Sequence, residues 1–88
     1  MILHIVQTSS RDILEQCLKT ANTDDVLLFI ENAVFLEPQT RNIKHTCFFL
    51  EADVTARGVT VNNPAQVIND SGFVELVCKT TKSVTWYL

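Results

Sequence analysis

The 88 residues of this chain are enough for one domain, and we expect residues 1–88 to form it. Seven Lys and Arg residues against ten Asp and Glu residues, with no basic run, argue against direct binding of nucleic acid. Hydrophobic residues make up 47% of the chain, so we expect a partner to cover part of the apolar surface.

The first half of the chain alternates apolar runs with amphipathic or polar segments. Residues 2–6, interrupted by His4, predict a buried strand, and Ser9 or Ser10 can cap the helix that follows. One face of that helix collects apolar residues at helical spacing: Ile13, Leu14, Cys17, Leu18 and Ala21. Residues 26–30 predict the clearest buried strand, residues 31–36 a short helical turn, and residues 38–44 a polar, mobile loop.

The second half continues the alternation. Residues 46–50 predict a third buried strand, followed by a short helix at residues 53–57 that Gly58 closes in the left-handed conformation. A short strand at residues 66–68 precedes the last helix. Asp70 or Ser71 is expected to cap this helix, whose inward residues are predicted to be Phe73, Val74, Val77 and Cys78. An edge strand at residues 83–87 completes an α/β domain with a parallel sheet and right-handed crossovers.

The cysteines indicate a reducing compartment. Cys17, Cys47 and Cys78 are odd in number and widely spaced, as is typical of reduced thiols in the cytoplasm rather than of a disulfide framework. No cysteine or histidine cluster predicts a metal, and with two glycines the chain offers no phosphate loop, so no cofactor is expected. The sequence predicts neither a signal peptide nor a membrane span.

Five segments in a fixed order carry a resemblance to a known family: Met1-Ile2-Leu3-His4, Leu27-Leu28-Phe29-Ile30-Glu31, Leu50 to Gly58, Gly72-Phe73-Val74-Glu75-Leu76, and Trp86. Over essentially the whole chain they resemble the TusB/DsrH family, small subunits of bacterial sulfur-relay complexes. The resemblance implies a small, flavodoxin-like, three-layer α/β domain, with a mostly parallel sheet of four or five strands flanked by helices. One departure is Asn32-Ala33-Val34, where family members often have an acidic residue, Gly and Val. Ala takes a positive φ only at a cost, so we expect a more helical turn.

The resemblance also implies partners and a function. Such a chain assembles with TusC/DsrF-like and TusD/DsrE-like subunits into a heterohexamer, and the principal sulfur-carrying cysteine belongs to the TusD/DsrE-like subunit. The complex passes persulfide sulfur, through an acceptor of the TusE/DsrC type, toward 2-thiolation of the tRNA wobble uridine. This chain is then a structural subunit rather than an enzyme on its own. Two alternatives stay open: a DsrH-like subunit of a sulfur-oxidation complex, and a self-associating binding domain unrelated to sulfur.

Individual residues carry competing interpretations. Cys17 aligns with a first-helix cysteine of some DsrH-like proteins, which makes it a candidate auxiliary sulfur acceptor, yet its apolar helix face also suits a buried thiol. His4 is either a hydrogen-bonded core histidine or a general base. Arg57 is a candidate interface residue. Its helical pair with Asp53 contributes only a few tenths of a kcal/mol, which is too little to explain why this segment matches the family. The last three residues, Trp86, Tyr87 and Leu88, either anchor a subunit contact or pack on their own domain.

Overall fold

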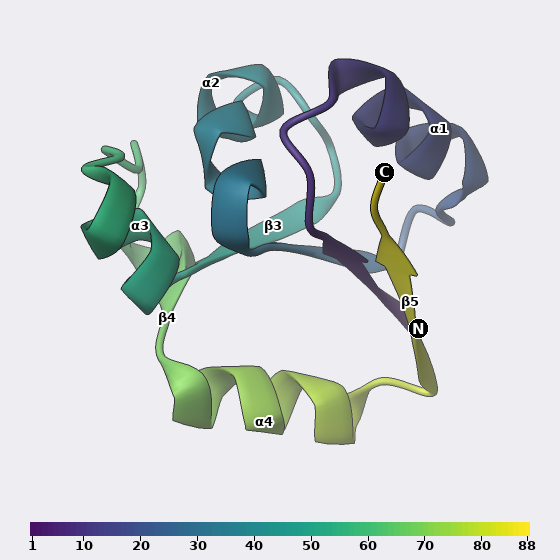
Figure 1. Cartoon of the computed structure of the whole chain (residues 1–88). Helices are drawn as coiled ribbons and strands as arrows, with labels where there is room; N and C mark the ends of the chain where they lie inside the picture. Colours follow the sequence, from purple (N-terminus) through teal and green to yellow (C-terminus); the bar gives the residue numbers. More distant parts are fainter.

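A single sheet of five parallel strands forms the centre of the computed structural model, which describes residues 1–88 (Figure 1). The strands are β1 (Ile2–Val6), β2 (Val26–Phe29), β3 (Thr46–Leu50), β4 (Val67–Ile68) and β5 (Lys82–Trp86). They lie in the order β4-β3-β2-β1-β5, and every neighbouring pair is parallel. The predicted α/β architecture and the edge position of β5 are therefore confirmed.

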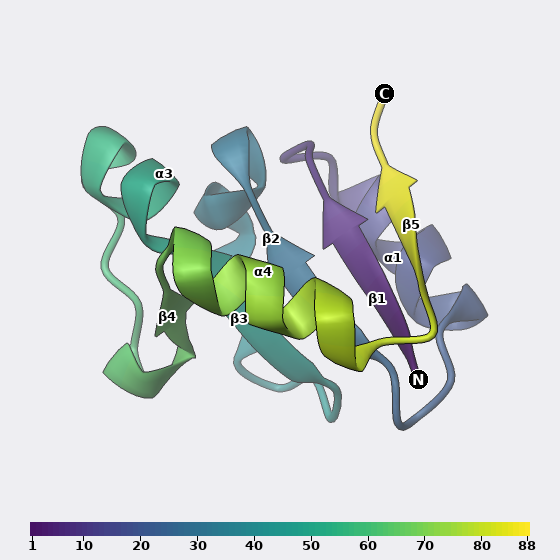
Figure 2. The ribbon, with the colours of Figure 1, turned by 90° about the horizontal axis from the view of Figure 1, so that it is seen from below.

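Helices cover the two faces of the sheet unequally. One face carries α1 (Arg11–Thr20), the 3₁₀-helix η1 (Glu31–Leu36), α2 (Glu37–Thr40) and α3 (Glu51–Arg57) (Figure 1). The other face carries only α4 (Asp70–Lys79), which crosses the strands in Figure 2. A further 3₁₀-helix, η2 (Pro64–Gln66), leads into β4. None of these helices has the length and apolar character that spanning a bilayer requires.

Two hydrophobic clusters, one on each side of the sheet, make up the core. Below α1, η1 and α3, the larger cluster includes Phe29 and Phe49, whose stacked rings have centroids 5.1 Å apart. Under α4, the smaller cluster joins Leu3, Val26 and Leu28 to Leu76. Because β2 contributes to both clusters, all four of its residues are buried, and this explains its continuous apolar sequence.

Local sequence signals set several element boundaries. The Ser10 hydroxyl accepts a hydrogen bond from the Ile13 backbone N–H at the start of α1, as predicted. Gly58 closes α3 with a φ of 62°, the left-handed conformation expected for it. At α4 the cap is Asn69, whose side-chain oxygen accepts from the Gly72 N–H at 2.9 Å. The prediction that Asp70 or Ser71 caps this helix was one residue or two too late.

The prediction of a polar, mobile loop at residues 38–44 was wrong in its first part. The short helix α2 occupies Glu37–Thr40 and buries the Glu37 carboxylate. That carboxylate accepts hydrogen bonds from the Arg41 guanidinium and from the Asn62 backbone N–H. Burial alone raises the pKa of the Glu37 carboxyl, but these hydrogen bonds outweigh it and hold the pKa below its ordinary value.

The predicted inward face of α4 was also wrong in part. Phe73 packs against the core, and Leu76 is buried there. Val74 and Val77, however, are 63% and 42% exposed, and Cys78 is exposed as well. Gly72 lies so close to the sheet that a Cβ on it would come within 3.0 Å of the Ile68 Cβ, which fixes the rotation of the helix. The apolar residues of α4 lie on more than one of its faces, so their periodicity alone did not identify the face that packs on the sheet.

Candidate functional site

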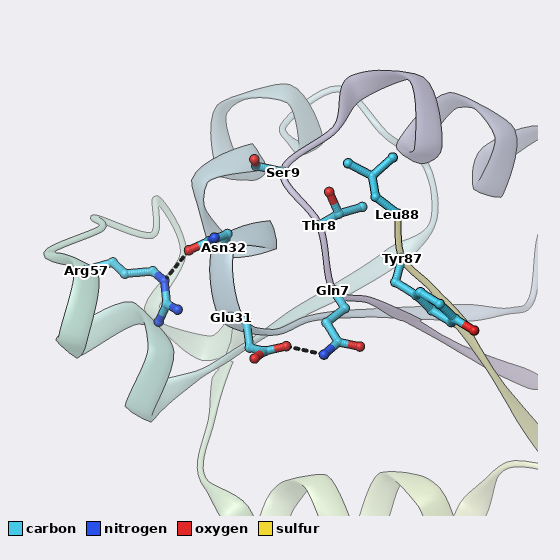
Figure 3. Close-up of a pocket in the computed structure, with 8 residues that line it drawn as sticks. All are labelled: Gln7, Thr8, Ser9, Glu31, Asn32, Arg57, Tyr87 and Leu88. Carbon is cyan, nitrogen blue, oxygen red and sulfur yellow. Dashed lines mark hydrogen bonds between the residues drawn. The ribbon is translucent and has the colours of Figure 1, made fainter.

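A cavity of about 510 Å³ opens at the carboxyl edge of the sheet, the edge at which α/β proteins usually bind ligands. Its walls come from the segments that follow β1, β2 and β5, and from α3 (Figure 3). The lining residues are mostly polar: Gln7, Thr8, Ser9, Glu31, Asn32, Arg57, Tyr87 and Leu88. No cysteine is among them, so the cavity presents no thiol of this chain that could carry sulfur.

The helix α3 holds one wall of this cavity through Asp53 and Arg57. One Asp53 oxygen accepts from the backbone N–H of Glu31 at 2.8 Å, and the other accepts from Arg57 at 3.1 Å. The Nε of Arg57 donates to the side-chain oxygen of Asn32 at 2.9 Å. Together the two side chains clamp the first two residues of η1. An isolated helical ion pair contributes only a few tenths of a kcal/mol to stability. Asp53 and Arg57 contribute more than this, because they also form hydrogen bonds with Glu31 and Asn32.

The clamped turn contains an unusual backbone conformation. Glu31 has a φ of 51°, and it is the only residue other than glycine with a positive φ. The next residues continue as η1, in which Ala33 and Val34 are fully buried. The expectation of a more helical turn at residues 32–34 is confirmed. The positive φ is taken by Glu31, whose carboxylate accepts a hydrogen bond from the Gln7 side-chain amide.

The structure separates the three C-terminal residues. Trp86 points back into the domain, where its indole Nε1 donates to Nδ1 of His4 at 3.1 Å. Tyr87 and Leu88 instead line the cavity and are 67% and 87% exposed. Of the four predicted interface residues, Arg57, Tyr87 and Leu88 are thus brought together at one cavity, whereas Trp86 is engaged within its own fold.

His4 belongs to a buried hydrogen-bond network. Because Nδ1 accepts from Trp86, the proton of the neutral ring lies on Nε2, which donates to Asp25 at 2.9 Å. The Asp25 carboxylate also accepts from the backbone N–H groups of Ile2 and Asn22. Burial raises the pKa of Asp25, but these hydrogen bonds outweigh it and lower the pKa to about 2. The interpretation of His4 as a hydrogen-bonded core histidine is confirmed.

The cysteines differ sharply in accessibility. Cys17 and Cys47 lie in the larger core cluster, and burial raises the pKa of each to about 12. For Cys17, nearby Cys47 and Asp25 raise it further. Sulfur transfer needs an accessible thiolate, so this geometry favours the structural interpretation of Cys17, and its role as a sulfur acceptor stays a prediction. Cys78, expected in the core, is exposed on α4 instead. No group of three or more His, Cys, Asp or Glu residues is placed to hold a metal ion.

Sequence reasoning did not identify the polar wall formed by Gln7, Glu31 and Asn32. A signal was present, because these residues directly follow the apolar runs of β1 and β2. The carboxyl ends of neighbouring parallel strands meet at one edge, so polar side chains immediately after them gather there.

A comparison with protein-family models finds a match over most of the chain. The model described as "DsrH like protein" matches residues 8–83, which run from the segment after β1 into β5. The matched region includes α1 with Cys17 and the clamp formed by Asp53 and Arg57. A search of curated proteins finds no match.

Proposed function

The chain belongs to the DsrH-like family, and from this premise we propose that it is a structural subunit of a sulfur-relay complex in the cytoplasm. In this proposal the complex passes persulfide sulfur between proteins. Its other members are TusC/DsrF-like and TusD/DsrE-like subunits in a heterohexamer, and the TusD/DsrE-like subunit carries the reactive cysteine. This chain completes and shields the assembly.

The observation that carries the structural role is the state of the cysteines. Two of the three thiols are buried in the core with their pKa values raised to about 12, so they stay protonated at neutral pH. Cys78 is exposed, but it lies on the opposite side of the sheet from the helices that frame the cavity. No cysteine of this chain therefore lines the cavity, and the proposal assigns sulfur transfer to a partner.

The surface that we assign to a partner is the rim of the cavity at the carboxyl edge. Arg57 lies on one side of this cavity and Tyr87 and Leu88 lie on the other (Figure 3), and arginine and tyrosine are enriched in the centres of protein interfaces. Large apolar side chains as exposed as those of Tyr87 and Leu88 are stabilised when a partner removes them from water. Trp86 supports this surface indirectly, because its hydrogen bond to His4 fixes the strand that ends beside the cavity.

The destination that we propose for the sulfur is 2-thiolation of the tRNA wobble uridine, through an acceptor protein of the TusE/DsrC type. The net charge of −3 supports leaving contact with the tRNA to other proteins. A second candidate is a sulfur-oxidation complex in which Cys17 is an auxiliary sulfur acceptor, as its position within the matched region allows. Alkylation of Cys17 in the native complex supports that candidate, and protection of Cys17 argues against it.

Co-expression tests the proposed assembly. A tagged copy of this chain is produced with the TusC-like and TusD-like proteins of its source, and the purified material is analysed by size-exclusion chromatography with light scattering. The proposal predicts that all three chains elute together as a heterohexamer. A homodimer of this chain that excludes both partners contradicts it and favours a self-associating domain.

A further inference from the structure

The charges at the cavity are not balanced. The positive charge of Arg57 is paired with Asp53, whose carboxylate lies 3.1 Å from it. The Glu31 carboxylate is exposed and forms no salt bridge, since its side-chain partner is the neutral amide of Gln7. Glu31 is thus the charged group of the cavity wall that lacks a counter-ion.

Glu31 is also held in place before any partner arrives. Its backbone N–H is fixed by Asp53, and the helix η1, which begins with Glu31, is anchored by the buried side chains of Ala33 and Val34. The Gln7 amide orients the carboxylate through its hydrogen bond (Figure 3). A charge that is already positioned loses little conformational entropy on binding, which favours affinity.

The neighbouring groups suit a cation. Donation of the Gln7 amide N–H to Glu31 leaves the Gln7 side-chain oxygen without an intramolecular partner, so it can accept a further hydrogen bond. Tyr87 lines the same cavity and is largely exposed, and in Figure 3 Gln7 lies between Glu31 and Tyr87. Aromatic rings attract ammonium and guanidinium groups, and Leu88 can cover the aliphatic part of a long basic side chain.

We propose that Glu31, Gln7 and Tyr87 form a receptor for one basic side chain, a lysine or an arginine, of a neighbouring subunit. The proposal rests on the assignment of this chain to a hetero-oligomeric complex and specifies the chemistry of the contact. The carboxylate supplies the counter-charge, the Gln7 oxygen accepts a hydrogen bond, and the Tyr87 ring lies against the cation. The Arg57–Asp53 pair does not bind the partner's charge but fixes the turn that presents Glu31.

A competition experiment tests this receptor. A tagged variant and an untagged wild-type chain are co-expressed in equal amounts with the two partner subunits, and native mass spectrometry measures the share of each in the complex. We expect Glu31→Gln to be incorporated about tenfold less than wild type, as for loss of a close interfacial charge pair. Glu31→Arg is expected to be excluded. The matched control is Glu51→Arg on α3, an exposed acidic residue beside a different cavity, which competes equally with wild type.

Two further readouts separate charge recognition from damage to the fold. Thermal unfolding of the isolated variants shows whether they fold, and Glu31→Gln keeps the shape of the side chain. Exchanging each Lys or Arg of the partner surface for Glu should identify one position that restores incorporation of Glu31→Arg. Equal incorporation of Glu31→Arg and wild type overturns the receptor while leaving the assembly intact. Absence of any complex with the wild-type chain overturns both the receptor and the proposed function.

Discussion

The carboxylate of Asp53 accepts the backbone N–H of Glu31 at 2.8 Å, which ties α3 to the turn after β2 across 22 residues of sequence. The same carboxylate holds Arg57, which in turn reaches Asn32. A short helix that buries no residue completely thus determines the shape of one wall of the cavity.

Removing the clamp should destabilise the domain. In Asp53→Ala the Glu31 N–H and the Arg57 guanidinium lose their shared acceptor, and water replaces it in part because the contact at Glu31 is exposed. We expect the free energy of unfolding to fall by about 0.5–1.5 kcal/mol. Urea denaturation measures the change, with Asp24→Ala as control, because Asp24 is exposed and forms no side-chain hydrogen bond. Equal stability of the two variants would show that the clamp contributes nothing.

Replacing Glu31 by glycine should stabilise the isolated chain and weaken its assembly. The positive φ of this residue costs an L-amino acid about 1 kcal/mol, whereas glycine adopts it freely. The free energy of unfolding should therefore rise by up to about that amount. The control is Glu15→Gly in the middle of α1. Glycine inside a helix is expected to lower the free energy of unfolding of this variant by about 1 kcal/mol. Urea denaturation of both variants gives the comparison. A less stable Glu31→Gly chain contradicts the inference of strain at this turn.

The two neighbouring aromatic residues at the C-terminal end should behave differently. Trp86→Phe removes the donor to His4 and leaves the buried Nδ1 of His4 without a partner. We expect the free energy of unfolding of the isolated chain to fall by about 1–2 kcal/mol. Tyr87→Phe leaves the stability of the isolated chain unchanged, since its hydroxyl has no partner within the domain. Thermal unfolding of both variants checks this. If Trp86→Phe unfolds like wild type, the hydrogen bond to His4 is not a stabilising contact.

Asp25 should make the fold sensitive to acid. The pKa of its carboxyl is about 2 in the folded chain, below the ordinary value of 3.8. A lowered pKa means that the folded state favours the ionised form, so the stabilisation is present above about pH 4. It is lost as the pH falls from about 4 toward 2. Glu37 acts in the same direction, so the difference between wild type and Asp25→Asn isolates the contribution of Asp25.

Urea midpoints measured across this pH range give that difference. The wild-type advantage over Asp25→Asn should be largest near neutral pH and should shrink on acidification. A difference that does not change with pH would mean that the buried carboxylate titrates alike in the folded and unfolded chain.

The strands β1, β2 and β3 were predictable from sequence because each is an almost continuous apolar run between polar segments. Residues 2–6 and 46–50 match β1 and β3 in full, and Gly58 identified the end of α3. The helix α2 was not predicted, because its residues are polar and include Pro38, which occurs in the first turn of a helix as well as in loops. Its buried Glu37 is satisfied by the Asn62 backbone, 25 residues away, and no local pattern reveals such a contact.

The cavity was predictable only in pieces. Arg57, Tyr87 and Leu88 were each identified as interface candidates, but their meeting depends on the order of β1, β2 and β5 in the sheet. Trp86 was assigned to the same role because an indole near a chain end resembles an anchor. Its hydrogen bond to His4 spans 82 residues and becomes visible only when β1 and β5 pair.

The location of the transferred sulfur tests most directly whether this chain is a structural subunit. The co-expressed complex is loaded with persulfide sulfur, and native mass spectrometry followed by dissociation into subunits records the mass of each chain. We expect the mass of one added sulfur atom on the TusD-like chain and none on this one. Added sulfur on this chain that disappears in a Cys17→Ser variant would contradict the structural role and make Cys17 a sulfur carrier.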